Sequence, residues 1–522
     1  MGVPLEIRQV PRPKNTIVDD NKRPGPFQYA VRERSGVSYV SSGNPKPRNG
    51  KVIGHIFNGK FVPVETQKQT KESKPSMLSY GSSELARSLS KDIFDDLVDV
   101  FPGDKAYAIM VISILRVIRP NVTMSRMSTQ YKKSFLSLFF PGTHLSKNYI
   151  SNLFDNIGQD VFRRRTFYAK RLERVCKEHH IAIDGTLKQN NSIVNDLAHF
   201  SYKSKVKWTR DISVLYAYDV ENKEPLCATV FPGNCIDASA YGRFIKENKI
   251  TKGIIVDDKG FPVNNIRSEL ANNPELHYLT PIKRNDRRIT KYNALTFTEV
   301  VSGIGKHIVG NKVSLPDGTF LYAFRDTDLA HFEEIAYMSN SEKKKEFDAD
   351  KFAKQTSSFG TIVFESDVDM SVKDAYLTYD SRWLLEVMFK QYKSNEALEK
   401  TRVQGDFSVI GSEFVNFIST LITNRIINHA RECGVLDEMS YGDMMEDLNS
   451  VWRYTDAPQA PSRSDGGWAH SIPSDIELME KLKLSSVSYT EQKKKESEEK
   501  EALKEDAEKQ VKRPRGRPRK QK

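Results

Sequence analysis

Residues 181 to 283 contain a series of apolar runs whose order limits the folds that the chain can adopt. Three of these runs have the length and composition of buried strands: IAIDGT, RDISVLYAYDV and EPLCATVFPGN. DASAYGRFIKEN and FPVNNIRSELANN have helical patterns, whereas GIIVDD and LHYLTPIKR are further apolar strands. The order strand, strand, strand, helix, strand, helix, strand predicts an α/β fold with a mixed sheet and flanking helices.

The remaining sequence divides into regions of different composition. Asn58-Gly59 separates two alternating runs and predicts a small β-hairpin in a basic, Pro- and Gly-rich arm. We expect a basic arm with this hairpin (1–80), a helical region (81–180), the first part of the α/β domain (181–283), a β-rich insertion (284–376), the second part of the α/β domain (377–440), a C-terminal extension (441–487) and a disordered charged tail (488–522).

Composition narrows the class of protein. A chain of 522 residues with 38% hydrophobic and 28% charged residues has the composition of a soluble globular protein. The longest apolar run, AYAIMVISILRVI, is shorter than the roughly 20 residues that span a bilayer, and the N-terminus lacks a signal-peptide core. The four cysteines form no CxxC pair, which argues against zinc and disulfides. We expect a cytoplasmic protein without a membrane role.

The formal net charge is +12, which favours a polyanionic partner such as nucleic acid. Many basic proteins carry such an excess only for solubility, so charge alone leaves both explanations open.

Acidic residues follow two of the predicted strands. Asp184 ends IAID, and Asp257-Asp258 ends GIIVDD. Strand ends of an open α/β sheet border the crevice where ligands bind, and carboxylates gathered there can hold divalent metal. Each Asp alone is also compatible with a turn or helix cap. His179 and His180 are poor partners for Mg²⁺, and we interpret them as ordinary polar residues before a strand.

A third carboxylate lies in the segment YDSRWLLEVMFKQYK, residues 379–393. If this segment is one helix, Tyr379, Arg382, Glu386 and Lys393 share a stripe about 60° wide. Arg382 and Glu386 alone could be an i, i+4 pair on a solvated face. A helix that packs against the sheet would instead add Glu386 to the acidic strand ends. Three carboxylates suit two Mg²⁺ or Mn²⁺ ions and phosphodiester cleavage or transfer.

These motifs resemble the DDE transposases of the insertion-sequence type, which have an RNase H-like catalytic domain and a Tyr-x2-Arg-x3-Glu-x6-Lys signature. The stripe matches this signature, and Asp258-Lys259-Gly260-Phe261 matches the D-x-G-[FY] motif of the same branch, so we select Asp258 over Asp257. The resemblance covers roughly residues 180 to 430. It implies that Asp184, Asp258 and Glu386 are catalytic metal ligands, that Arg382 and Lys393 contact DNA phosphates, and that Tyr379 positions the transposon end.

DNA recognition has weaker signals. Arg515, Gly516, Arg517 and Pro518 form the core of an AT-hook-like motif suited to a narrow A·T minor groove, although a solvated basic tail or a localisation patch is the alternative. By elimination, the region 81–180 and the N-terminal hairpin are candidates for binding terminal inverted repeats. The run Arg163–Arg165 could equally be a solvated helix face.

The resulting hypothesis is a nucleoid-associated transposase that acts as a homodimer on DNA, cleaves element ends and joins them to target DNA. One alternative is a catalytically inactive, transposase-derived protein that binds A·T-rich DNA. Another is a related metal-dependent nuclease, which would use the same carboxylates without joining DNA strands.

Overall fold

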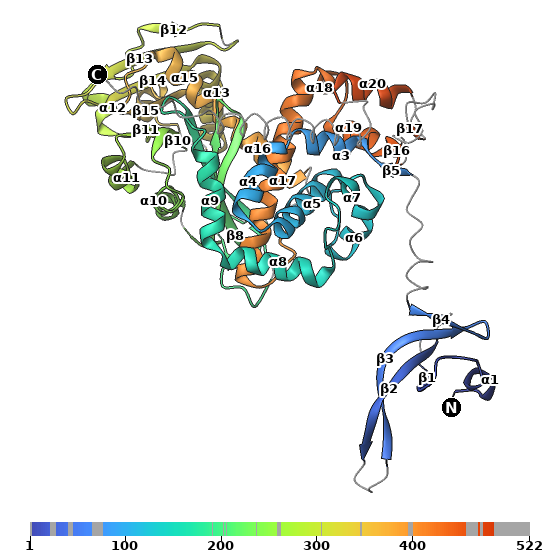
Figure 1. Cartoon of the computed structure of the whole chain (residues 1–522). Helices are drawn as coiled ribbons and strands as arrows, with labels where there is room; N and C mark the ends of the chain where they lie inside the picture. Colours follow the sequence, from blue (N-terminus) through green and yellow to red (C-terminus); the bar gives the residue numbers. More distant parts are fainter. Residues whose placement is uncertain are drawn as a thin grey trace, which may run out of the picture. The chain divides into compact units, whose positions relative to one another are not determined.

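The computed structural model describes most of the chain and divides it into two compact units, Met1–Ser76 and Met77–Lys522. The described residues are 3–20, 28–39, 45–64, 77–190, 192–201, 203–204, 206–235, 237–257, 263–303, 305–344, 347–394, 400–455, 468–469 and 473–484. Each unit is considered by itself below (Figure 1).

The N-terminal unit contains an antiparallel sheet in the order β1-β2-β3-β4. Its elements are α1 (Leu5–Arg8), β1 (Thr16–Asp20), β2 (Tyr29–Tyr39), β3 (Pro45–Phe57) and β4 (Lys60–Pro63). Asn58 and Gly59 join β3 to β4 with φ angles of 49° and 70°, as a two-residue turn of type I′ requires. The predicted hairpin is therefore present, and β1 and β2 extend it to four strands.

The second unit begins with a short strand that the sequence did not indicate, followed by the predicted helical region. The elements are β5 (Met77–Ser79), α3 (Gly81–Ser88), α4 (Lys91–Val100), α5 (Gly103–Ile118), α6 (Met124–Lys133), α7 (Leu136–Phe139), α8 (Lys147–Gln159) and α9 (Val161–Leu172). The long apolar run forms α5, a buried helix. None of the helices in the described part of the chain has the length and apolar content needed to cross a bilayer.

A large mixed sheet follows. Its first elements are β6 (His180–Gln189), β7 (His199–Phe200), β8 (Arg210–Asp219), β9 (Glu224–Pro232), α10 (Asp237–Asn248), β10 (Lys252–Val256), η1 (Val263–Asn265), α11 (Arg267–Asn272) and β11 (Glu275–Ile282). β8 pairs antiparallel with β6 and β9, whereas β10 pairs parallel with both β6 and β11. This is the mixed α/β sheet with flanking helices that the sequence predicts.

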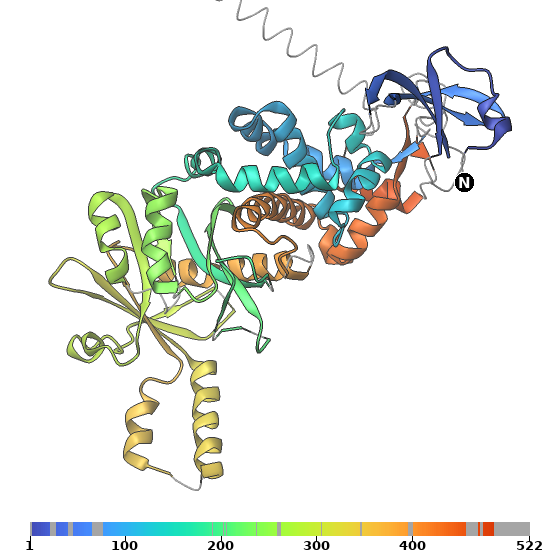
Figure 2. The same cartoon turned by 90° about the horizontal axis from the view of Figure 1, so that it is seen from below.

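The β-rich segment from 284 to 376 continues this sheet. It contains α12 (Arg287–Lys291), β12 (Glu299–Val301), β13 (Ile308–Ser314), β14 (Phe320–Asp326), α13 (Thr327–Lys344), α14 (Ala349–Thr356) and β15 (Thr361–Ser366). β15 pairs antiparallel with β11, which joins β12–β15 to the main sheet. The helices α13 and α14 extend away from the sheet in Figure 2.

The segment predicted as one helix forms two. α15 (Val372–Ser381) and α16 (Trp383–Ser394) meet at Arg382. The Arg382 N–H donates to the Tyr379 carbonyl at 3.1 Å, and the Leu385 N–H donates to the Arg382 carbonyl at 3.0 Å. These three-residue bonds tighten the chain locally, so the uniform 100° periodicity assumed for a single helix does not hold through Arg382.

The helix α17 (Asp406–Glu432) packs between the helical region and the sheet, and most of its residues are buried. The rings of Phe417 on α17 and Tyr216 on β8 stack at 5.9 Å between centroids. The remaining elements are α18 (Val435–Glu438), α19 (Tyr441–Ser450), β16 (Trp452–Tyr454), β17 (Trp468–Ala469) and α20 (Pro473–Lys481). β16 pairs with β5 and β17, so the chain returns to the start of this unit.

A network of ion pairs also ties α17 to earlier elements. Arg425 on α17 and Arg171 on α9 both bind Asp92 on α4 and Glu224 on β9. Burial alone would raise the pKa of the Asp92 carboxyl, but the hydrogen bonds and charges of Arg425 and then Arg171 outweigh it and hold this pKa well below its usual range.

Two glycines permit the close crossing of α8 and α17. A Cβ atom added to Gly411 would lie 1.8 Å from the Phe154 carbonyl oxygen, and one added to Gly158 would lie 1.8 Å from that of Phe407.

We predict that Gly411→Ala lowers the free energy of unfolding by about 1–3 kcal/mol or more, because the two backbones must separate. Urea denaturation measures the change. Gly103→Ala, where a Cβ meets nothing within 4 Å, is the control, and equal effects of the two substitutions would contradict the argument.

The ion-pair network gives a pH-dependent prediction. Because the folded-state pKa of Asp92 lies below its unfolded value of about 3.9, its stabilisation is present above that pH and is lost as the pH falls further. Asp92→Asn should cost about 1–2 kcal/mol at pH 7, less than a fully buried pair, because the Asp92 side chain is 43% exposed. The difference from wild type should shrink toward pH 3 in denaturant titrations. The exposed Asp95→Asn on the same helix is the control.

Candidate active site

Asp184 lies at the level where β6 leaves its parallel neighbour. The pairing of β6 with β10 ends at Ala182 and Val256, whereas the pairing with β8 continues past Asp184 to Gln189. Asp184 is therefore within a strand rather than at its end, contrary to the sequence-based expectation, because the hairpin partner β8 extends β6 beyond the apolar run. The Asp184 side chain is 26% exposed, and its Oδ1 accepts a hydrogen bond from the Gly185 N–H at 2.7 Å.

Arg382 connects two of the three predicted catalytic carboxylates. Its Nη2 donates to Glu386 Oε1 at 2.7 Å, and its Nη1 lies 3.8 Å from Asp184 Oδ2. The guanidinium side chain is only 13% exposed, so both interactions are partly screened from water. The structure thus brings Asp184 and Glu386 around one cationic group, although they are separated by about 200 residues in the sequence.

Tyr379 supports this arginine. The Arg382 guanidinium carbon lies 5.6 Å from the centre of the Tyr379 ring, within the range of a cation–π contact. The Tyr379 ring also packs against the Phe364 ring of β15, with 4.3 Å between the ring centroids. The tight turn between α15 and α16 therefore holds Tyr379, Arg382 and Glu386 together in a way that differs from a stripe on one helix.

Several predicted site residues lie wholly or partly outside the described residues. Asp258 and the AT-hook-like residues 515–518 are among those that the structure does not describe. Lys393 lies on α16, but its side chain is outside the description.

The neighbouring Asp257 has a different environment. Its side chain is fully buried, and its Oδ2 accepts a hydrogen bond from the Tyr241 hydroxyl of α10 at 3.0 Å. Burial, followed by the negative charge of Asp257, raises the pKa of Tyr241 well above its usual value, so the phenol remains a hydrogen-bond donor. This environment suits a carboxylate that anchors α10 against the sheet.

A second polar group lies where β6 begins and β8 ends. The ligand atoms of His179, Asp219 and Glu221 lie within 4.8 Å of one another. His179 Nδ1 is 2.9 Å from Asp219 Oδ2, and Asn222 also donates to both oxygens of Asp219. These hydrogen bonds give the carboxylate a structural role in closing the turn.

His180 links this turn to the helix before Arg382. Its Nδ1 is 2.6 Å from Glu221 Oε1, and its Nε2 is 3.2 Å from the Thr378 hydroxyl. The sequence around His180 indicates only an ordinary polar residue, because residues 180, 221 and 378 are far apart along the chain. The contact attaches β6 to α15 at the residue before Tyr379.

The side chains around Arg382 include two carboxylates of the chemical type that holds divalent metal. Two carboxylates already share one positive group, and carboxylate oxygens are the ligands preferred by Mg²⁺. Asp184 and Glu386 thus offer the type of ligand atom that such an ion requires.

Comparison with known proteins gives a family match for the segment that contains these residues. Residues 176–409 match the family model described as Transposase DDE domain. None of the curated proteins matches the sequence. The family match confirms the resemblance to DDE transposases over this segment.

Two solved structures are also similar. One is a piggyBac transposase synaptic complex with hairpin DNA, at 13% identity and a TM-score of 0.37, covering 66% of this chain and 70% of that chain. The other is a Mos1 transposase paired-end complex with left transposon end, at 10% identity and a TM-score of 0.14, covering 29% of this chain and 52% of that chain.

The environment of Asp257 predicts a structural effect of its removal. Asp257→Ala should lower the free energy of unfolding by about 1–3 kcal/mol, because the buried Tyr241 hydroxyl loses its Asp257 acceptor. Asp184→Ala should cost less, since Asp184 is partly exposed. Parallel urea titrations of the two variants test this difference. Equal losses of unfolding free energy in the two variants would mean that the buried hydrogen bond between Asp257 and Tyr241 does not stabilise the fold.

Proposed function

We propose that this chain, whose residues 176–409 match the transposase DDE domain, is a DNA transposase that cleaves DNA and transfers the cut strand. The observation that carries the proposal is the meeting of Asp184, Arg382 and Glu386 within that domain. It gives a compact set of acidic metal ligands beside a cation suited to phosphate.

In this proposal, Asp184, Asp258 and Glu386 hold Mg²⁺ or Mn²⁺, with two ions in the active complex. Such ions, when bound, activate water or a 3′-hydroxyl and stabilise the leaving oxygen. Arg382 holds the substrate through bidentate contacts to phosphate, and Lys393 adds a point charge. Tyr379 keeps the guanidinium in position by packing beside it.

The choice of Asp258 rather than Asp257 as the second acidic ligand is supported by a motif and by the environment of Asp257. Asp258-Lys259-Gly260-Phe261 matches the D-x-G-[FY] motif. Asp257 is fully buried and accepts a hydrogen bond from Tyr241, which suits an anchoring role rather than metal binding.

The finer parts of the proposal follow from the resemblance and from charge. They are an insertion-sequence element as the source, terminal inverted repeats as the recognised DNA, and a homodimer that holds two ends. The division of the chain into an end-binding region (81–180), a two-part catalytic domain with an insertion, and an AT-hook-like tail belongs to the same proposal. The formal net charge of +12 is compatible with each DNA contact.

A catalytically inactive DNA-binding derivative is the second candidate. It would use the same basic surfaces, but it would gain little from carboxylates gathered beside a DNA phosphate, because they repel the polyanion. Arg382 offsets part of that repulsion without explaining why the carboxylates are retained.

The catalytic proposal predicts separate effects of acidic substitutions on cleavage and on binding. The purified full-length protein is incubated with labelled DNA carrying the ends that flank its gene, with Mg²⁺ or Mn²⁺, and cleaved and joined strands are resolved. Wild type should produce both. Asp184→Asn, Asp258→Asn and Glu386→Gln should each reduce cleavage at least about 100-fold, because an essential metal ligand is lost, while DNA binding is retained.

Asp257→Asn is the matched control, as it changes the adjacent acidic residue whose buried hydrogen bond suits an anchoring role. Full activity in a Glu386→Gln variant would remove Glu386 from the catalytic set. Cleavage without joined products would indicate the nuclease alternative, and binding without cleavage would favour the inactive derivative.

A further inference from the structure

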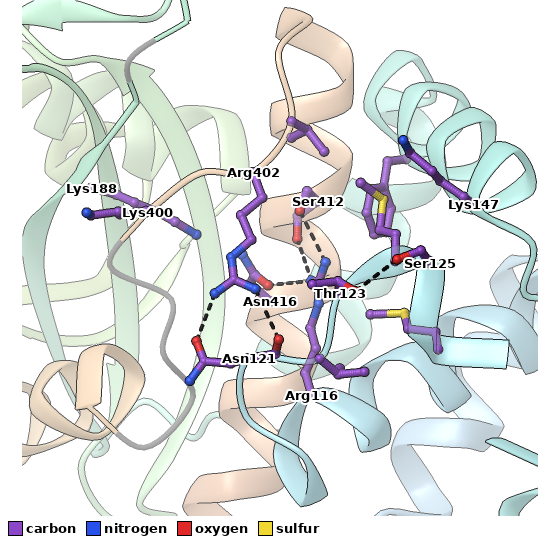
Figure 3. A pocket seen from close by; sticks show the side chains of 15 residues that line it. Arg116, Asn121, Thr123, Ser125, Lys147, Lys188, Lys400, Arg402, Ser412 and Asn416 are labelled. Carbon is purple, nitrogen blue, oxygen red and sulfur yellow. Dashed lines mark hydrogen bonds between the residues drawn. The ribbon is translucent and has the colours of Figure 1, made fainter. Parts of the chain in front are cut away.

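A pocket separate from the acidic site lies between the helical region and the end of β6. It has a volume of about 290 Å³ and is lined by side chains from α5, α6, α8, β6, α17 and the segment that precedes α17 (Figure 3). Of its fifteen described lining residues, five are basic and none is acidic. The basic residues are Arg116, Lys147, Lys188, Lys400 and Arg402. Such a concentration of cations in a hollow attracts anions.

Neutral groups hold the two arginines in the pocket. Arg402 Nη2 donates to Asn121 Oδ1 at 2.8 Å, and its Nη1 donates to the Asn121 carbonyl at 3.4 Å. Arg116 donates to the Asn416 side chain and to the Ser412 carbonyl, as Figure 3 shows. Amide and carbonyl acceptors fix a guanidinium without cancelling its formal charge. Arg402 therefore brings a positive charge to the pocket.

Lys188 differs from the other cations because a carboxylate neutralises it. Its Nζ donates to Glu413 Oε1 at 2.6 Å, and both side chains are almost fully buried. The anion-binding part of the pocket is therefore assigned to Arg402, Lys400 and Lys147. The last two are exposed and can approach a ligand that extends beyond the pocket.

The backbone around these cations is itself well anchored. The Thr401 N–H donates to the Gln189 carbonyl at 2.8 Å, so the segment carrying Lys400 and Arg402 is attached to the end of β6. On the other wall, α6 begins just after Thr123, whose side chain makes no capping hydrogen bond. The positive end of this helix dipole adds to the potential at the pocket.

The position of Lys188 relates the pocket to the acidic site. Asp184 and Lys188 are four residues apart on β6, and residues separated by an even number project to the same face of a strand. At about 3.3 Å per residue, the two positions are roughly 13 Å apart along the strand. Lys188 is buried against Glu413 of α17, so these two positions give the direction from the acidic site to the pocket rather than a path for the DNA.

We infer that this basic pocket binds a backbone phosphate of the DNA that flanks the phosphodiester reacting at Asp184 and Glu386. The inference rests on the proposed function for the path of the strand. The pocket would fix the register of the DNA relative to the carboxylates, and Arg402 and Lys400 would supply its principal phosphate contacts.

The experiment measures DNA binding by the full-length protein at several salt concentrations, using an oligonucleotide duplex with the flanking ends. The slope of log K against log[salt] is negative, and loss of one phosphate contact decreases its magnitude by about 0.9. Arg402→Gln should show this decrease and bind about tenfold more weakly at low salt, because one charge-assisted hydrogen bond is lost. Lys400→Gln should behave in the same direction. Arg402→Lys keeps the charge and should preserve the slope.

Lys132→Gln is the matched control, since Lys132 is an exposed cation on α6 that does not line the pocket. Thermal unfolding of each variant checks that the fold is intact. A second series replaces single phosphates of the duplex by neutral methylphosphonates. One position flanking the cleaved bond should weaken binding to wild type and have no further effect on Arg402→Gln.

The outcomes separate the two proposals. DNA binding and cleavage by wild type, with unchanged slopes in Arg402→Gln and Lys400→Gln, would overturn the pocket assignment and leave the proposed function intact. Displacement of the duplex by equal concentrations of inorganic phosphate or a mononucleotide would indicate a small-anion site and would also overturn it. Failure of wild type to bind DNA would remove the proposed function and this inference together.

Discussion

The close crossing of α8 and α17 is the constraint on which the arrangement of the larger unit depends. At Gly158 and Gly411 the two helix backbones approach so closely that a methyl group would overlap a carbonyl oxygen. From this crossing, α17 meets the sheet on one side and α5 on another, through Phe417 against Tyr216 and the hydrogen bond from Ser419 to Ser113. The crossing therefore sets the distance between the helical region and the sheet that carries Asp184.

The same helix places polar groups against cations of neighbouring elements. Ser412 and Asn416 on α17 hold Arg116 of α5 and line the basic pocket, whereas Glu413 holds Lys188 of β6. Buried ion pairs such as Lys188 with Glu413 add little net stability, because desolvation offsets most of their attraction. Their effect is to select one register of α17 against β6.

The sequence was most informative where a local pattern was strong. The strands and helices from 181 to 283 were recognisable because buried strands are apolar over several residues and turns separate them. Asn58-Gly59 likewise identified its hairpin, because few residues adopt two consecutive positive φ angles.

Features that depend on tertiary contacts were harder to predict. The helix break at Arg382 is not marked by a Pro or Gly residue in the sequence. The helix α13 has a weak apolar pattern, because Ala330 is its one buried residue among those described. The positions of Asp184 and Glu386 followed from the family-like motif, whereas the guanidinium between them required coordinates. The contact of His180 with Glu221 and Thr378 joins three distant segments and leaves no local signal.

The ion-pair network around Arg425 has a consequence for the order in which the chain can fold. Asp92 and Arg425 are 333 residues apart, so their contact forms only after most of the polypeptide has been synthesised. The core of the larger unit lacks α17 until then, so the apolar surfaces that α17 covers stay exposed until this late segment has been synthesised. Contacts of such long range also slow folding, because the loop that they close is large. The N-terminal unit has its own small core of Val10, Val18, Val31 and Ile56 and does not depend on that late segment.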